Sequence, residues 1–280
     1  MKICVLIPVY MTDNSRDINL ANLRKLKDSE FKYVDEVVIC DQCFIDSDYI
    51  EGFTYLGPFG KLPNGVYDAR NKLLEWFYHS DYDYTLLMDA RESLSKAGLN
   101  SFVTICNAIH DNNINLDCIQ GTIGINISQE RIADKQRKDY KENVWIRPGK
   151  PQTHLHHTFI SNFNKKYGEE IYIETDVIMA GDFKIPEDIY FTNKLDRYFD
   201  LWIVGEMAVN TGPQSASSWA TTKGAESTKG IQWQKALGIA LDKYCDVVFG
   251  YKERPVQPIV LTRVPEYKEE LTDYKPRTKR

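Results

Sequence analysis

The sequence predicts an α/β protein in which helices flank a mostly parallel central sheet. Short apolar runs alternate with amphipathic segments over the first 95 residues, and this alternation is typical of parallel strands joined by helical crossovers. The 280 residues show no internal repeat and no linker between two halves. We therefore expect one domain, with a core over residues 1–210 that residues 211–280 complete.

Four apolar runs predict the strands of the parallel sheet. They are short, rich in β-branched residues and bounded by polar residues, as buried strands are. These runs cover residues 2–9, 34–40, 53–56 and 84–88. Further along the chain, residues 118–127 and 170–182 have the pattern of extended backbone.

Helices are predicted where apolar residues recur every three or four positions. Leu20, Leu23 and Leu26 mark such a helix over residues 18–29. Comparable patterns cover residues 65–79, 96–110, 186–199 and 230–244. Residues 211–230 are dense in Ser, Thr and Gly and predict a mobile loop, so residues 211–280 form a helical and extended appendage.

Composition predicts a soluble, cytoplasmic protein with no membrane partner. Hydrophobic residues make up 42% of the chain and charged residues 27%, with a net charge of −5. No apolar run approaches the roughly 18–20 residues that span a bilayer, and the run in residues 3–8 is too short for a signal peptide. The six scattered Cys do not form a disulfide framework.

Charge is unevenly distributed along the chain. Residues 251–280 contain eight basic and five acidic side chains, a local charge of +3, whereas residues 1–250 carry −8. An acidic body argues against a protein that coats nucleic acid in bulk. The basic end is either an arm that contacts phosphate or a solvated tail.

The candidate site follows from the predicted topology. Ligands of open parallel sheets bind at the carboxyl ends of the strands, here residues 10–17, 41–44 and 89–93. A carboxylate at such an end, as at Asp89, suits a metal that bridges a diphosphate, and an Asp that caps the next turn is the alternative. Cys40 and Cys43 have redox-motif spacing, but no helix signal follows them, which disfavours a thioredoxin-like site.

Four segments, in this order, resemble inverting, family-two-like glycosyltransferases with the GT-A fold. They are MKICVLIPVY, DEVVICDQC, GVYDARNKLLEWFYHSDYDYTLLMDARE and IPEDIYFTNKL. The resemblance implies a single Rossmann-like GT-A domain that moves a sugar from a UDP-sugar donor to an acceptor hydroxyl. A nucleotidyltransferase of related architecture is disfavoured, because residues 11–17 lack the Gly-rich basic loop that holds a triphosphate.

The resemblance also implies roles for residues on the donor side. Pro8 and Tyr10 would border the nucleobase, and Asp41 would hydrogen-bond the base or the ribose. Arg70, in the matched Ala-Arg-Asn, would support the diphosphate, and Asp89 would reach the ribose or the metal.

One departure from the family pattern concerns the metal. Arg91 stands where the pattern usually has its second Asp, and a guanidinium cannot bind a divalent cation but pairs with phosphate. Mn²⁺ or Mg²⁺ would then be held by Asp89 and Glu92 with His157 as a downstream ligand, or be partly replaced by Arg91. The cluster THLHHTF around His157 also allows a zinc site or a packed His pair.

Asp188 matches the catalytic base of inverting members and would take the proton of the acceptor hydroxyl. The alternative is a first-turn carboxylate that complements the dipole of the helix over residues 186–199. Trp219 and Lys223 would lie in a lid that closes over the substrates, with an ordinary surface loop as the alternative.

The acceptor stays open between several classes. The chain resembles, more weakly, the transferases by which phages add arabinose or glucose to 5-hydroxymethylcytosine in their double-stranded DNA. A polysaccharide or a protein acceptor is the alternative within the same chemistry. A catalytically degenerate GT-A domain that only binds is the alternative from another class, and Arg91 would be its reason.

Overall fold

The computed structural model describes most of the first 90 residues and selected segments after them. The described residues are 1–29, 31–90, 93–94, 107, 110, 118–123, 143–148, 158–161, 170–176, 178–180, 183–185, 187–198, 201–210, 243–244, 247–248, 253, 257 and 259–262. The predicted helices over 96–110 and 230–244 and the loop over 211–230 lie outside them, apart from isolated residues of the two helices.

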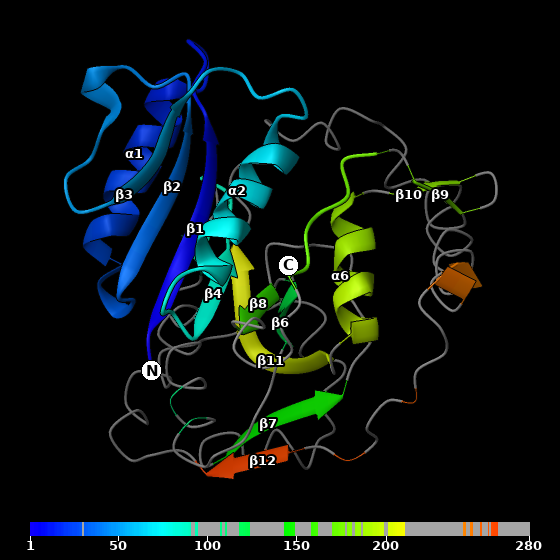
Figure 1. Ribbon diagram of the computed structural model, residues 1–280. Helices are drawn as coiled ribbons and strands as arrows, with labels where there is room; N and C mark the ends of the chain where they lie inside the picture. The colour runs from blue at the N-terminus through cyan, green and yellow to red at the C-terminus, as the bar shows by residue number, and fades with distance from the viewer. Residues whose placement is uncertain are drawn as a thin grey trace, which may run out of the picture.

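Four parallel strands form the first half of the sheet, in the order β3-β2-β1-β4 (Figure 1). These are β1 (Ile3–Tyr10), β2 (Glu36–Gln42), β3 (Thr54–Phe59) and β4 (Tyr84–Leu87). Strands β1, β2 and β4 are almost wholly buried because helices cover both faces, which explains their continuous apolar runs. The predicted parallel sheet is confirmed here.

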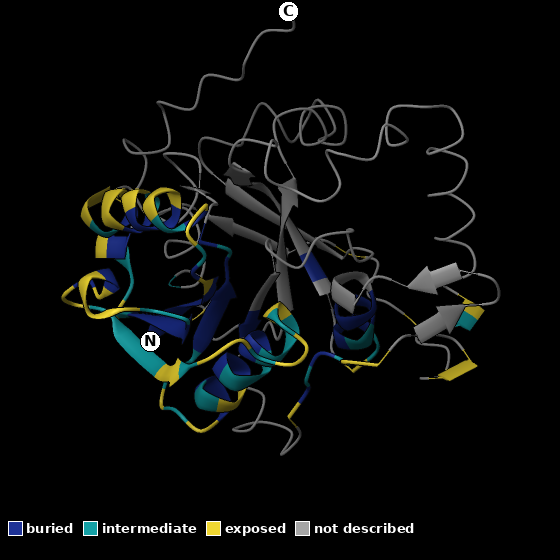
Figure 2. Ribbon diagram, turned by 90° about the horizontal axis from the view of Figure 1, so that it is seen from above, coloured by how far each residue is buried: buried dark blue, intermediate teal, exposed yellow. Residues whose placement is uncertain are grey.

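Helices α1 (Arg16–Ser29) and α2 (Val66–Tyr78) cover opposite faces of this half. Alternate residues of β1 belong to two separate core clusters, one with α1 and one with α2. Val5 and Ile7 lie in the α1 cluster, whereas Leu6 lies in the α2 cluster with Leu73 and Phe77. Buried and exposed residues alternate along the helices accordingly (Figure 2).

The second half of the sheet is mixed. Beyond β4 the order continues β8-β6-β11-β7-β12, and β4–β8, β8–β6, β11–β7 and β7–β12 are antiparallel pairs, whereas β6–β11 is parallel. The strands are β5 (Ser93–Leu94, paired with β11), β6 (Cys118–Ile123), β7 (Asn143–Pro148), β8 (Thr158–Ser161), β11 (Leu201–Asn210) and β12 (Ile259–Thr262). Only β6 was expected from the sequence. Strand β12, from the appendage, pairs within the same sheet.

The expected strand over 170–182 is wrong for most of its length. Residues 170–176 form no strand, and only Ile178–Ala180 (β9) does so, paired with β10 (Phe183–Ile185). Helix α6 (Glu187–Tyr198) follows where the sequence predicts it. Two short 3₁₀ helices, η1 (Phe31–Tyr33) and η2 (Asp46–Asp48), complete the described elements. None of the described helices has the length and apolar character to cross a membrane.

The stability of the fold is expected to depend on the buried face of α2. Leu73 is fully buried in the α2 cluster, so Leu73→Ala leaves a cavity and should lower the free energy of unfolding by about 2–5 kcal/mol. Val66, on the first turn of the same helix, is 38% exposed, so Val66→Ala should change the free energy of unfolding by less than about 0.5 kcal/mol. Urea unfolding measures both values; equal losses would contradict this packing.

Candidate functional site

The carboxyl ends of β1, β2 and β4 lie at one edge of the sheet, where α2 also begins (Figure 1). Pro8 pairs with Cys40 and Tyr10 with Gln42, so the ends of β1 and β2 are level. Pro8 is buried, whereas Tyr10 is 42% exposed at the edge. The structure therefore brings the predicted residues Pro8, Tyr10 and Asp41 together at this edge.

An ion pair joins two other predicted residues at the same edge. Arg70 Nη2, from the second turn of α2, donates to Asp89 Oδ1, two residues after β4, over 2.8 Å. The Arg70 side chain is only 6% exposed, whereas that of Asp89 is 38% exposed. The guanidinium thus holds the carboxylate from the protein side, and the carboxylate faces solvent with a fixed orientation.

Asp41 is enclosed by the protein. Its carboxylate is 1% exposed, accepts a hydrogen bond from Tyr49 Oη at 3.0 Å, and accepts another from the Phe59 backbone N–H at 3.2 Å. Burial, and then the bond to Asp41, raises the pKa of the Tyr49 phenol, which therefore stays protonated and donates. Asp41 joins the loop after β2 to the end of β3 in this structure, and its contact with a nucleobase stays a prediction.

Gln42 lies at the same edge, and the sequence analysis gave it no role; the residue is buried, with 1% of its surface exposed. It pairs with Tyr10 across parallel strands, so its side chain lies on the same face of the sheet as Tyr10, opposite to that of Asp41. Its Oε1 accepts from the Leu62 backbone N–H at 3.3 Å. Strand alternation was the available signal, because it places Pro8, Tyr10 and Gln42 on one face.

Two contacts hold the loops around this edge. Arg16, at the start of α1, forms an ion pair with the buried carboxylate of Asp48 in the loop after β2. Asn22 Nδ2 donates to the Ala90 carbonyl over 2.7 Å and so ties α1 to the turn after Asp89. The edge is therefore organised before any ligand binds.

The described residues do not by themselves form a metal site. They contain no group of three or more His, Cys, Asp or Glu side chains placed to hold one ion. Asp89 is the described member of the expected ligand set, and its carboxylate is shared with a guanidinium. Glu92 and His157, like Arg91, Trp219 and Lys223, lie outside the described residues.

Asp188 is the second residue of α6, as the sequence predicts. Its backbone is helical, and the position of its carboxylate lies outside what the structure describes. Its role as a base stays a prediction.

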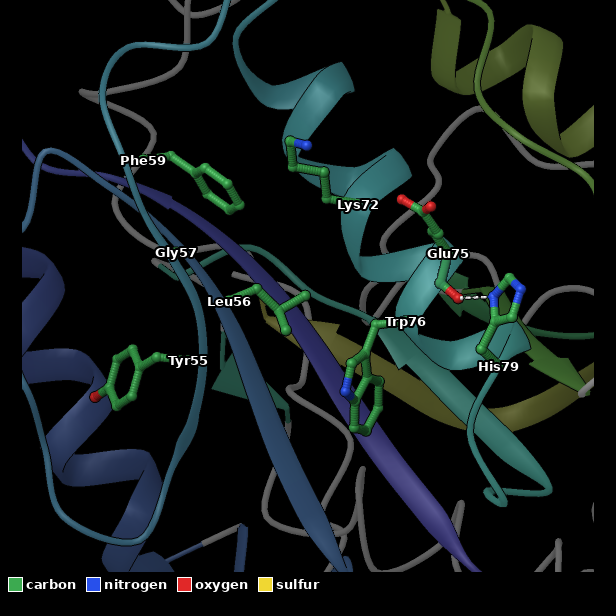
Figure 3. Close-up of a pocket in the computed structure, with 8 residues that line it drawn as sticks. All are labelled: Tyr55, Leu56, Gly57, Phe59, Lys72, Glu75, Trp76 and His79. Carbon is green, nitrogen blue, oxygen red and sulfur yellow. Dashed lines mark hydrogen bonds between the residues drawn. The ribbon is translucent and has the colours of Figure 1, made fainter.

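Two open hollows flank α2 away from the predicted residues. The first, of about 500 Å³, lies between β3 and α2, with Leu56, Phe59, Lys72 and Trp76 on its walls (Figure 3). The second, of about 570 Å³, shares Lys72 and Glu75 with it. Neither is lined by a residue that the sequence analysis singled out, so we place the candidate site at the carboxyl edge.

Comparisons with known proteins identify the fold. No family model matches the chain, and no curated protein matches it. S. aureus TarS, residues 1–349, superposes with a TM-score of 0.51 at 16% identity, over 89% of this chain and 83% of that one. The mannosyltransferase PcManGT from Pyrobaculum calidifontis, in complex with GDP-Man and Mn²⁺, gives 0.51 at 13% identity, over 96% and 68%. These likenesses show the fold, which is the GT-A fold expected from the four segments.

The chain is shorter than several of the structures that it resembles. It spans 66% of S. aureus TarS 1–349 in complex with UDP-GlcNAc, with a TM-score of 0.49 at 16% identity and 86% of this chain covered. It spans 43% of S. aureus TarS itself.

The close approach of Gly57 to the Asp41 carboxylate leads to a prediction. Gly57 has a φ of +139°, which L side chains rarely adopt, and a Cβ there would collide with the Asp41 carboxylate. Gly57→Ala should lower the free energy of unfolding by about 1–3 kcal/mol. Gly60→Ala is the matched control, because a Cβ at Gly60 meets no atom within 4 Å. Urea unfolding compares the two, and equal stability of both variants would contradict the arrangement around Asp41.

Proposed function

We propose that this chain is a glycosyltransferase that transfers a sugar from a nucleoside-diphosphate donor, UDP-linked, to an acceptor hydroxyl. The observation that carries the proposal is the Arg70–Asp89 ion pair at the carboxyl edge of a GT-A sheet. The order of the four sequence segments supports it independently. The mannosyltransferase with this fold, whose structure contains GDP-Man and Mn²⁺, supports a nucleotide-sugar donor.

On the donor side, the exposed ring of Tyr10 borders the nucleobase, with Pro8 beneath it. Asp89 accepts a hydrogen bond from a ribose hydroxyl. Arg70 orients the Asp89 carboxylate and offsets its charge, which would otherwise repel the diphosphate nearby. Arg91 pairs with a phosphate oxygen, since guanidinium groups bind phosphate in a bidentate way.

The chemical step is a direct displacement with inversion. Asp188 takes the proton of the acceptor hydroxyl, and the oxygen attacks the anomeric carbon of the donor sugar. The bond from that carbon to the diphosphate oxygen breaks, and its electron pair leaves with the diphosphate. Mn²⁺ or Mg²⁺, held by Asp89, Glu92 and His157, would offset that charge when bound, and Trp219 and Lys223 would cover the site.

For the acceptor, the resemblance to phage transferases selects 5-hydroxymethylcytosine in double-stranded DNA. The basic residues 251–280 support a contact with phosphate, because they carry +3 on an acidic chain. Polysaccharide and protein hydroxyls are the other acceptors to compare.

One experiment tests the proposal as a whole. The purified chain is incubated with a panel of UDP-sugars and with GDP-mannose, in Mn²⁺, Mg²⁺ or EDTA, and the products are weighed by mass spectrometry. Acceptors are DNA with and without hydroxymethylcytosine, a polysaccharide and a protein. A mass gain of one sugar on the modified DNA is the expected result. Donor hydrolysis alone would reject the DNA acceptor, and no turnover of any donor would reject the enzyme.

Asp89→Ala should weaken donor binding about ten- to a hundred-fold, because a charged hydrogen bond contributes about 1.5–3 kcal/mol. Titration calorimetry with UDP measures the dissociation constant. Asp81→Ala is the control, because Asp81 is exposed and precedes β4 at the opposite edge of the sheet. Unchanged affinity in the Asp89 variant would show that the donor lies elsewhere.

Asp188→Asn should lower kcat by at least about a hundred-fold and leave the donor affinity within about two-fold, since an amide cannot accept the acceptor proton. Glu187→Gln, at the preceding position of α6, removes the same charge and should keep kcat within about two-fold. Steady-state transfer rates compare the two variants. Retained turnover in Asp188→Asn would remove Asp188 from the mechanism.

A further inference from the structure

Residues 170–174 form an extended strap without regular secondary structure (Figure 1). The strap passes between α2 and α6. Its Ile171 and Ile173 side chains are buried in the same core cluster as Leu73 of α2 and Phe191 of α6. The strap therefore fills the space between the two helices and contacts the cores of both.

The Asn71 side chain replaces the strand partner that the strap lacks. Asn71 Nδ2 donates to the Ile173 carbonyl over 2.8 Å, and the Ile173 N–H donates to Asn71 Oδ1 over 2.8 Å. One carboxamide thus satisfies both backbone groups of a buried residue, 102 positions away in the sequence. This pairing fixes the register of the strap on α2 as well as its distance from the helix.

Two further contacts hold the ends of the strap. Near one end, Tyr78 Oη, from the last turn of α2, donates to the Ile171 carbonyl over 2.7 Å. At the other end, Lys194 Nζ, from α6, donates to Glu174 Oε1 over 2.6 Å. The strap is therefore hydrogen-bonded to both α2 and α6, so the position of one helix depends on that of the other.

Asn71 adjoins the donor side of the site. The three residues Ala69, Arg70 and Asn71 follow one another on the second turn of α2, where Ala69 packs in the core and Arg70 holds Asp89. Asn71 holds the strap from the same turn. The chain then runs from the strap through β9 and β10 to the first turn of α6, which contains Asp188.

We propose that Asn71 is a positioning residue that sets α6, and with it Asp188, relative to the Arg70–Asp89 pair. The inference rests on the proposed function, since α6 carries the proposed base. Reacting groups must lie in near-attack geometry, and a misplacement of about 1 Å can cost about a hundred-fold in rate. Loss of the Asn71 pairing therefore acts on the chemical step more than on donor binding.

Tyr78 provides the control that separates positioning from plain stability. Tyr78→Phe removes one hydrogen bond to the same strap, about two helical turns from Arg70. A merely structural strap predicts similar effects for both residues. A positioning role predicts that only Asn71 affects the reaction.

The experiment compares Asn71→Ala, Asn71→Asp and Tyr78→Phe with the unaltered chain. Transfer kinetics give kcat and the donor KM, and hydrogen exchange reports protection of the Ile173 amide. Asn71→Ala should lower kcat at least ten-fold, keep the donor KM within about two-fold and lose the protection. Asn71→Asp retains the acceptor for the Ile173 N–H and should give an intermediate kcat. Tyr78→Phe should keep kcat within about two-fold.

Several results would overturn the inference. These are an unchanged kcat in Asn71→Ala, an equal loss of kcat in Tyr78→Phe, or a loss confined to the donor KM. If Asn71→Ala does not fold, an unchanged kcat in Asn71→Asp overturns it equally. Absence of donor binding and turnover in the unaltered chain would instead reject the proposed function, and Ile173 exchange would still show whether the pairing forms.

Discussion

The packing of α2 on the parallel strands is the constraint on which the candidate site depends. The helix buries Leu73 and Phe77 against β1 and its neighbours, so its rotation about its own axis is fixed. With that rotation fixed, two consecutive polar residues of the second turn reach two different segments of the chain. Arg70 reaches Asp89 at the end of β4, and Asn71 reaches the strap before α6. A rotation of α2 would break both contacts together.

The last two residues of β2, Asp41 and Gln42, lie on opposite faces of the sheet and have different contacts. Asp41 lies on the α1 face and accepts hydrogen bonds from Tyr49, in the loop after β2, and from the backbone of Phe59, at the end of β3. Gln42 lies on the α2 face beside Tyr10. Asp41 thus supports its surroundings in this structure, and its contact with a nucleobase stays a prediction. Its neighbour Gln42 lies on the same face of the sheet as the exposed Tyr10 ring.

Local patterns made half of this fold predictable. Burial determines the apolar runs of β1, β2 and β4 and the apolar periodicity of α1, α2 and α6. Each of these patterns lies within one segment, so it can be recognised from the sequence alone. Strands β7, β8, β11 and β12 depend on partners far along the chain and were not predicted, although β11 (LWIVGEMAVN) opens with an apolar run that could have indicated a strand. The error over 170–176 has the same cause, because a side-chain amide 102 residues away replaces a strand ladder.

Recognition of the Arg70 and Asp89 motifs came from the resemblance, whereas their contact came only from the structure. The burial of Asp41 was not predictable, because it depends on how closely the backbone of β3 approaches Asp41 at Gly57. Charge and residue type suggest which side chains bind a ligand. Which of those side chains face the ligand depends on the packing around each side chain.

We propose that the carboxyl edge around Tyr10, Arg70 and Asp89 binds a nucleoside diphosphate. A crystal structure of the chain with UDP tests it most directly. We expect the uracil ring against Tyr10, a ribose hydroxyl at Asp89 and the diphosphate at the amino-terminal side of α2. UDP bound in the hollow between β3 and α2, with the carboxyl edge empty, would contradict it.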